Sequence, residues 1–243
     1  MSDECTTYFQ FPLTMLRPEK PDHYKKAKPQ RTDETIQRIV SYTIWHYGLS
    51  LHNKAQDQIE TLAEDYAAAH PKITFDKKSY EHKVVMAAAS RLNVNLGCVD
   101  TSLSRGKALC AEHGEHGTQC RIRSDLLWSA HNEDWPLVKW KTLCGVVAGI
   151  GADPYKWLTY SLIQSLGAGY KSPRECKADD LLPKSSVRYW IGQLWMQNVF
   201  QICGDKNRLY YSIRHADDRA LALELKNRPI QKRVKKRINT SMV

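Results

Sequence analysis

The stretch that most constrains the fold is an amphipathic run followed at once by two β-like segments. Within residues 182–198, apolar side chains recur at the spacing of a helix packed by one face, namely Val187, Trp190, Ile191, Leu194 and Trp195. Pro183 suits the first turn of this helix. Residues 199–203 and 208–214 are rich in β-branched and aromatic residues, and the Gly-Asp-Lys-Asn sequence between them favours a hairpin turn. We therefore expect a half-buried helix followed by a β-hairpin.

Two more helices are expected just before this run. An apolar segment from Leu137 to Ile150 ends at glycines and a proline, which is typical of a buried helix. Residues 158–167 predict a short helix capped by Thr159, with Leu162, Ile163 and Leu166 on its inner face and Gly167 as its stop. The region therefore reads as three helices and a hairpin.

This order of elements resembles a winged helix-turn-helix DNA-binding domain over residues 135–215. The resemblance implies that the helix beginning near Lys184 is a recognition helix, with its N-terminal half in the major groove. On its outer face the implied DNA contacts are Lys184, Ser185, Ser186, Arg188, Tyr189 and Gln193. At the tip of the wing they are Lys206, Asn207 and Arg208. One feature departs from the family, because the link over residues 168–181 is longer than the usual short turn. It could hold an insertion that is basic at Lys171 and Arg174. The start of the recognition helix is therefore open by a few residues.

The charge of the chain favours a polyanionic partner. Lys and Arg number 36 against 26 Asp and Glu, which gives a formal net charge of +10 and an isoelectric point near 9.2. Residues 17–31 and 226–237 hold much of this excess and look like solvated arms. We expect the second arm to contact phosphates through Lys232, Arg233, Lys235, Lys236 and Arg237.

The first part of the chain is expected to be helical. Residues 8–13 read as a short strand or an extended segment. A first helix is expected from residue 32 or 33 to Leu49 with Gly48 as the stop, and a second from an Asn53 cap to a point before Pro71. Further helices are expected from residue 76 or 77 to Leu92 and over residues 104–112. Residues 118–128 suggest a strand leading into a helix. We divide the chain into an arm (1–31), a helical domain (32–130), a winged-helix domain (135–215) and a C-terminal helix with a basic tail (216–243).

Two clusters of side chains could form chemical sites. Cys110, His113, His116 and Cys120 could ligate zinc, but their spacing is not that of a common zinc finger, and Gly114 and Gly117 also suit a plain turn, so zinc stays open and no metal is predicted.

Asp217 or Asp218 with Glu224 and Lys226 resembles the acidic arrangement of metal-dependent nucleases. Such a motif sits on a strand, whereas this segment reads as a capped helix, so we predict no catalytic residue, no cofactor and no enzymatic activity. Phosphate-binding and hydrolase motifs are also lacking in the sequence.

The fold we predict is mainly α, with an N-terminal helical domain and a C-terminal winged helix carrying a small β-hairpin. The function we predict is sequence-specific binding of double-stranded DNA, as in a transcriptional regulator. A plasmid or phage replication initiator, and a nuclease that uses the winged helix for targeting, remain as alternatives, and a homodimer stays open. No run is apolar enough for a membrane span, and the scattered cysteines favour the cytoplasm; they are Cys5, Cys98, Cys110, Cys120, Cys144, Cys176 and Cys203.

Overall fold

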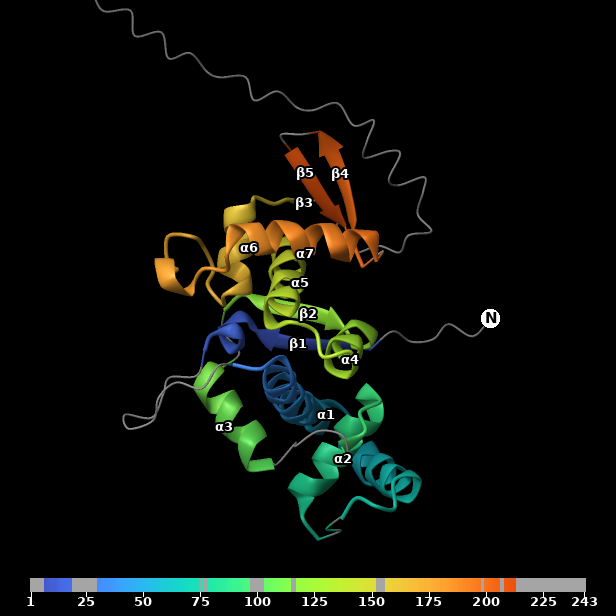
Figure 1. Cartoon of the computed structure of the whole chain (residues 1–243). Coiled ribbons are helices and arrows are strands. Elements are labelled where there is room, and N and C mark those ends of the chain that lie inside the picture. Colours follow the sequence, from blue (N-terminus) through green and yellow to red (C-terminus); the bar gives the residue numbers. More distant parts are fainter. Residues whose placement is uncertain are drawn as a thin grey trace, which may run out of the picture.

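The computed structural model describes residues 7–18, 30–74, 76, 78–96, 103–114, 117–151, 156–197, 199–205 and 208–212, and this part of the chain is mainly helical (Figure 1). Its elements in chain order are β1 (Tyr8–Pro12), η1 (Leu13–Leu16), α1 (Thr32–Ala69), α2 (Tyr80–Leu92), α3 (Leu103–His113), β2 (Gln119–Arg123), α4 (Ser124–Asn132), α5 (Leu137–Ile150), β3 (Lys156–Trp157), α6 (Tyr160–Gly167), η3 (Ala178–Asp180), α7 (Lys184–Met196), β4 (Gln201–Asp205) and β5 (Arg208–Ser212). In Figure 1, α1, α2 and α3 form one end of the molecule, and α6, α7 and the β3–β5 sheet form the other.

A two-stranded sheet joins the start of the chain to its middle. β1 pairs antiparallel with β2, with Phe9 opposite Ile122 and Phe11 opposite Cys120. These four side chains are buried, as alternation along a strand with one face on the core requires. The expected strand near the N-terminus and the expected strand-to-helix step into α4 are therefore confirmed.

The first long helix differs from the prediction. We expected it to stop at Gly48 and a second helix to begin at an Asn53 cap. The stop at Gly48 is wrong, because the helix continues past it. Two helical segments do meet within α1, at a kink at Ala55 (φ −149°, ψ 45°), two residues after the expected cap. Gly48 is buried against α2, where a Cβ atom would collide with Cγ1 of Val84. Its glycine therefore permits close helix packing and does not end the helix.

The remaining helices follow the prediction to within a few residues. α2 begins at Tyr80 after a Ser79 cap, a few residues later than expected. α3 and α5 match their expected ranges. α6 is capped by Thr159, whose Oγ1 accepts a hydrogen bond from the Leu162 N–H at 3.2 Å. Helical periodicity and capping were thus sufficient signals for these elements.

A three-stranded sheet lies beside α7. Its strand order is β3-β5-β4, with both neighbouring pairs antiparallel. The sequence predicted the hairpin but missed β3, and it wrongly placed Gly204 and Asp205 in the turn. Both residues belong to β4, where Asp205 pairs with Arg208.

The tryptophans of α7 are less buried than expected. Val187, Ile191 and Leu194 are buried, but Trp190 is only partly buried and Trp195 is 48% exposed. Placing both tryptophans in the buried stripe was therefore wrong. They lie at the two edges of the apolar arc, about 60–80° from its centre on a helical projection, where a neighbouring element does not cover them.

One apolar core runs through the described structure. It contains Phe9 and Ile39 from the first half of the chain together with Trp140, Val187 and Phe200 from the second half. The helical part (32–130) and the winged-helix part (135–215) of the predicted division therefore share buried surface. In the described part of the chain, no helix combines the length and apolar character that crossing a membrane requires.

Candidate nucleic-acid interface

The position of α7 is set by the residues at its two ends. Pro183 precedes the helix in an extended conformation (φ −59°, ψ 127°) and has no N–H that would need a partner there. Leu182 is buried and anchors the entering chain. After the last turn, the Val199 N–H donates to the Leu194 carbonyl at 3.0 Å. The helix therefore starts at Lys184, as the sequence predicted.

Residues three and four apart share a face of α7, so their side chains form lines along the helix. The buried line is Val187, Ile191 and Leu194. Opposite to it lies what we call the outer line, which consists of Ser185, Tyr189, Gly192 and Met196. On the outer line, Tyr189 is 58% exposed and Met196 is 71% exposed. The predicted contact residues are all at least partly accessible: Lys184, Ser185, Arg188 and Tyr189 are exposed, and Ser186 and Gln193 are intermediate.

Arg188 is held at the start of α6. Its guanidinium carbon lies 5.0 Å from the centre of the Tyr160 ring, the first residue of α6. The first N–H groups of a helix point outward and favour an anion. This arrangement places a cation and a helix start side by side. Tyr160 was not predicted as part of the site, because the contact depends on how α6 crosses α7.

Tyr189 is the exposed end of a series of contacts between aromatic and cationic side chains. Its ring meets Trp190 edge to face at 4.9 Å between centroids. The Nζ of Lys139 in α5 lies 5.8 Å from the Trp190 ring centre and 3.4 Å from that of Trp135. Burial lowers the pKa of Lys139, and nearby Glu133 acts in the opposite direction. No sequence signal marks Lys139, since it is one of two lysines, with Lys141, in a helix of mostly apolar residues.

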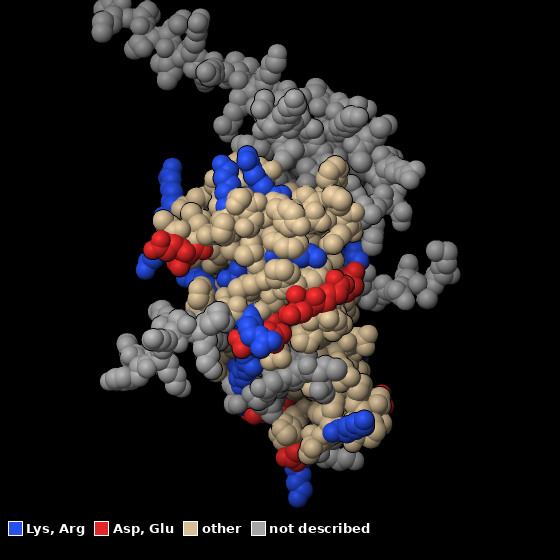
Figure 2. All heavy atoms as spheres, in the orientation of Figure 1, with Lys and Arg blue, Asp and Glu red and all other residues tan. Residues whose placement is uncertain are grey.

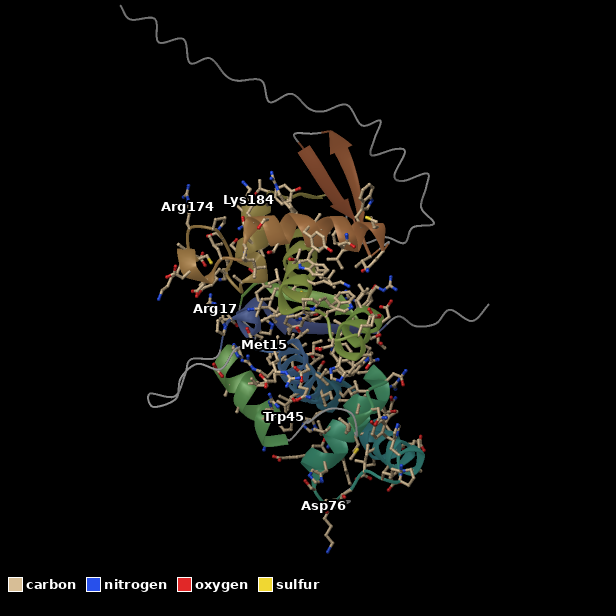
Figure 3. All side chains as sticks on the ribbon, viewed as in Figure 1. Met15, Arg17, Trp45, Asp76, Arg174 and Lys184 are labelled. Atoms are coloured by element: carbon tan, nitrogen blue, oxygen red, sulfur yellow. The ribbon has the colours of Figure 1, made fainter. Side chains whose placement is uncertain are left out.

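The charges of α7 are of one sign. Lys184 and Arg188 are its basic residues, both are exposed, and its sequence contains no Asp or Glu. In Figure 2, Lys and Arg side chains project from the end of the described body that carries α6 and α7, and Asp and Glu side chains lie at the left of this end and in a band across the middle of the view. Figure 3 labels Lys184 and Arg174 at this end. The surface there can contact phosphate groups.

The long link between α6 and α7 is fixed to the start of the chain. Arg17 donates from Nε to the Gly169 carbonyl at 3.0 Å, and its guanidinium carbon lies 4.2 Å from the centre of the Tyr170 ring. The Tyr170 hydroxyl donates to Oδ2 of Asp180 at 2.5 Å, a bond that raises the pKa of Tyr170.

The basic character expected of this link is only partly present. The expected cations Lys171 and Arg174 are exposed, but so are Glu175 and Asp179. Cations and carboxylates thus share the surface of the link, and α7 remains the more uniformly positive element.

Several predicted contacts lie beyond the described residues. At the wing, Arg208 belongs to β5 by its backbone, whereas Lys206 and Asn207 fall outside the described part. The same holds for Lys232, Arg233, Lys235, Lys236 and Arg237 in the tail, and for the nuclease-like residues Asp217, Asp218, Glu224 and Lys226.

The cysteine and histidine cluster has other contacts in the fold. Nδ1 of His113 lies 3.0 Å from Oγ1 of Thr14, and the thiol of Cys110 approaches the Tyr42 carbonyl at 3.9 Å. Cys120 is buried in β2, and His116 is outside the described residues. Within the ranges that the structure describes, no three His, Cys, Asp or Glu side chains are grouped so that they could hold a metal ion.

Comparison of the whole chain with protein-family models, with curated protein sequences and with solved structures finds no match in any of the three.

Proposed function

We propose that this chain binds double-stranded DNA through a winged helix-turn-helix domain over residues 135–215, with α7 as the recognition helix. The order of elements supports the proposal: α5, α6 and α7 are followed by the hairpin β4–β5. The pairing of β3 with β5 joins the hairpin to the segment between α5 and α6, which supports a role for the hairpin as a wing. A major groove about 12 Å wide admits a helix of this kind.

The observation that carries the proposal is the exposed face of α7. It combines two exposed cations, Lys184 and Arg188, with neutral donors such as Ser185 and Gln193 and with no carboxylate. Cations can neutralise phosphates, and side chains with N–H and O–H groups can reach base edges. We propose that this face gives sequence-specific binding of the kind a transcriptional regulator requires.

Fluorescence anisotropy with a labelled random-sequence duplex tests this proposal. The double variant Lys184→Ala/Arg188→Ala should bind about 30- to 150-fold more weakly than the wild type, because two charge-assisted contacts of about 1–1.5 kcal/mol each are lost. The matched control is Lys72→Ala/Arg91→Ala, which removes the same charges from exposed positions in the α1–α2 region.

The control should bind within about twofold of the wild type, since a change of that size corresponds to only about 0.4 kcal/mol. Two results would overturn the proposal: a wild-type protein that does not bind the duplex, or an α7 double variant that binds as tightly as the control.

A further inference from the structure

Gly192 in α7 differs from other helical glycines of the described structure. At Gly145, an added Cβ would lie 2.5 Å from the Ile163 carbonyl oxygen, and at Gly149 it would lie 2.9 Å from the methyl carbons of Leu158. At Gly167 it would collide with the carbonyl of Lys141. At Gly192, nothing that the structure describes lies within 4 Å of such an atom. The packing of the described chain thus gives no reason for a glycine there.

The helix itself also disfavours a glycine at this position. Gly192 lies near the middle of α7 with ordinary helical backbone, and glycine is among the least favourable residues in a helix interior. Alanine would make the same helix more stable. A missing side chain on an exposed face is useful where another molecule must approach the backbone closely.

The surroundings of Gly192 favour duplex DNA as that molecule. On the outer line, Gly192 lies between the exposed side chains of Tyr189 and Met196, and the adjacent line carries Lys184 and Arg188. A second copy of this chain would bring like charges together, because the chain carries a net charge of +10. The phosphates along one side of a major groove complement the two cations, which lie on one line of the helix.

We propose, building on the DNA-binding function above, that Gly192 is where base-pair edges come closest to the backbone of α7, and that Tyr189 and Met196 contact thymine methyl groups beside it. Gly192 and Met196 lie in the C-terminal half of α7, so the proposal extends the groove contact beyond the N-terminal half that the resemblance implies. The C5 methyl of thymine is the apolar group that base edges present in the major groove. Tyr189 is suited to such a contact because its ring is exposed and already packs edge to face against Trp190. Thymine-containing steps are then the sequence feature that this helix reads.

The test uses a duplex that the wild-type protein selects from a random pool, made once with thymine and once with uracil at every thymine. Gly192→Ala should raise Tm by about 2–4 °C, because alanine favours the helix. It should also bind the thymine duplex roughly tenfold or more weakly, because the new methyl group enters a tightly packed interface. The control Thr61→Ala raises helix propensity at an exposed position of α1 and should leave the affinity unchanged.

The uracil duplex separates methyl contacts from other contacts. Wild-type protein should bind it about fourfold more weakly for each methyl group contacted, the loss expected for one buried methyl-sized group. Tyr189→Ala/Met196→Ala should bind the two duplexes alike.

Each contrary result has a distinct meaning. If Gly192→Ala binds like the wild type, or if the pool shows no enriched sequence, the assignment of Gly192 is wrong while DNA binding stands. Equal binding of both duplexes by the wild type overturns the thymine contacts. If the wild type binds no duplex, this inference and the proposed function both fail.

Discussion

Lys141 is a lysine in the apolar helix α5, with 6% of its surface exposed. Its Nζ donates a hydrogen bond to Oε1 of Gln30 at 2.9 Å. Burial lowers the pKa of Lys141 to about 8, against the opposing effects of Cys144 and Asp180. At neutral pH the folded protein therefore holds a poorly solvated charge next to the start of α1.

This lysine should make stability depend on pH. In the unfolded chain its pKa returns to 10.5, so between about pH 8 and 10.5 the unfolded state binds more protons than the folded state. The contribution of Lys141 to the free energy of unfolding therefore rises with pH across that window, and its destabilising effect is fully present below pH 8. Lys141→Met should raise the free energy of unfolding by about 1–2 kcal/mol at pH 7.

Urea unfolding at several pH values measures this effect. The difference between Lys141→Met and the wild type should shrink as pH rises from 8 to 10.5. Lys177→Met, at an exposed position, serves as the control and should differ little from the wild type at any pH. A difference for Lys141→Met that is constant over this range contradicts the account.

Helical periodicity predicts the exposure of single side chains well near the centre of a face and poorly at its edges. Tyr189 lies opposite the apolar arc of α7 and is exposed as expected. Trp195 lies at an edge of the arc, where exposure depends on whether a neighbouring element reaches it. The contacts of Tyr160 and Lys139 were not predictable for a related reason, because they depend on the crossings of α6 and α5 with α7.

At the scale of elements, glycines have opposite effects in two helices. Gly48→Ala should destabilise the fold by about 1–3 kcal/mol, although alanine favours a helix, because its Cβ would displace Val84 and the α2 backbone. Thermal or urea unfolding of Gly48→Ala beside Gly192→Ala gives a direct comparison. An increase in stability in Gly48→Ala would show that α1 and α2 can move apart there.

The elements that the sequence predicted are those marked by signals in their own residues, such as apolar spacing and caps. α5, α6 and α7 were found from apolar spacing, the Thr159 cap and Pro183. β3 was missed because it spans two residues and its partner strand β5 lies about fifty residues later in the chain. The helix break was misplaced because a glycine that permits packing and a glycine that ends a helix look alike in a sequence.

On the scale of the whole molecule, the helical part and the part that carries α7 are joined at several points. They share one apolar core, and the link before α7 is held by Arg17. Lys141 adds a polar contact to Gln30. This arrangement fixes the orientation of α7, so the N-terminal half supports the proposed DNA-binding face.

The basic tail should add affinity without adding specificity. Residues 232–243 lie outside the described structure, and they contain five Lys and Arg residues and no Asp or Glu. Deleting them should weaken binding to all duplexes and leave the selected sequence unchanged, because basic arms contact phosphates. Selection from a random pool with the full and the shortened chain measures both effects, and a shift in the preferred sequence would show that the tail reads bases.

The salt dependence of duplex binding tests the central claim most directly. With about six phosphate contacts, the logarithm of the wild-type affinity should fall against the logarithm of salt concentration with a slope of about −5. Lys184→Ala/Arg188→Ala should reduce the steepness to roughly −3, because each lost contact removes about 0.9, and Lys72→Ala/Arg91→Ala should keep the wild-type slope. A flat wild-type affinity, or equal slopes for both double variants, would contradict the account that α7 is the DNA-binding face.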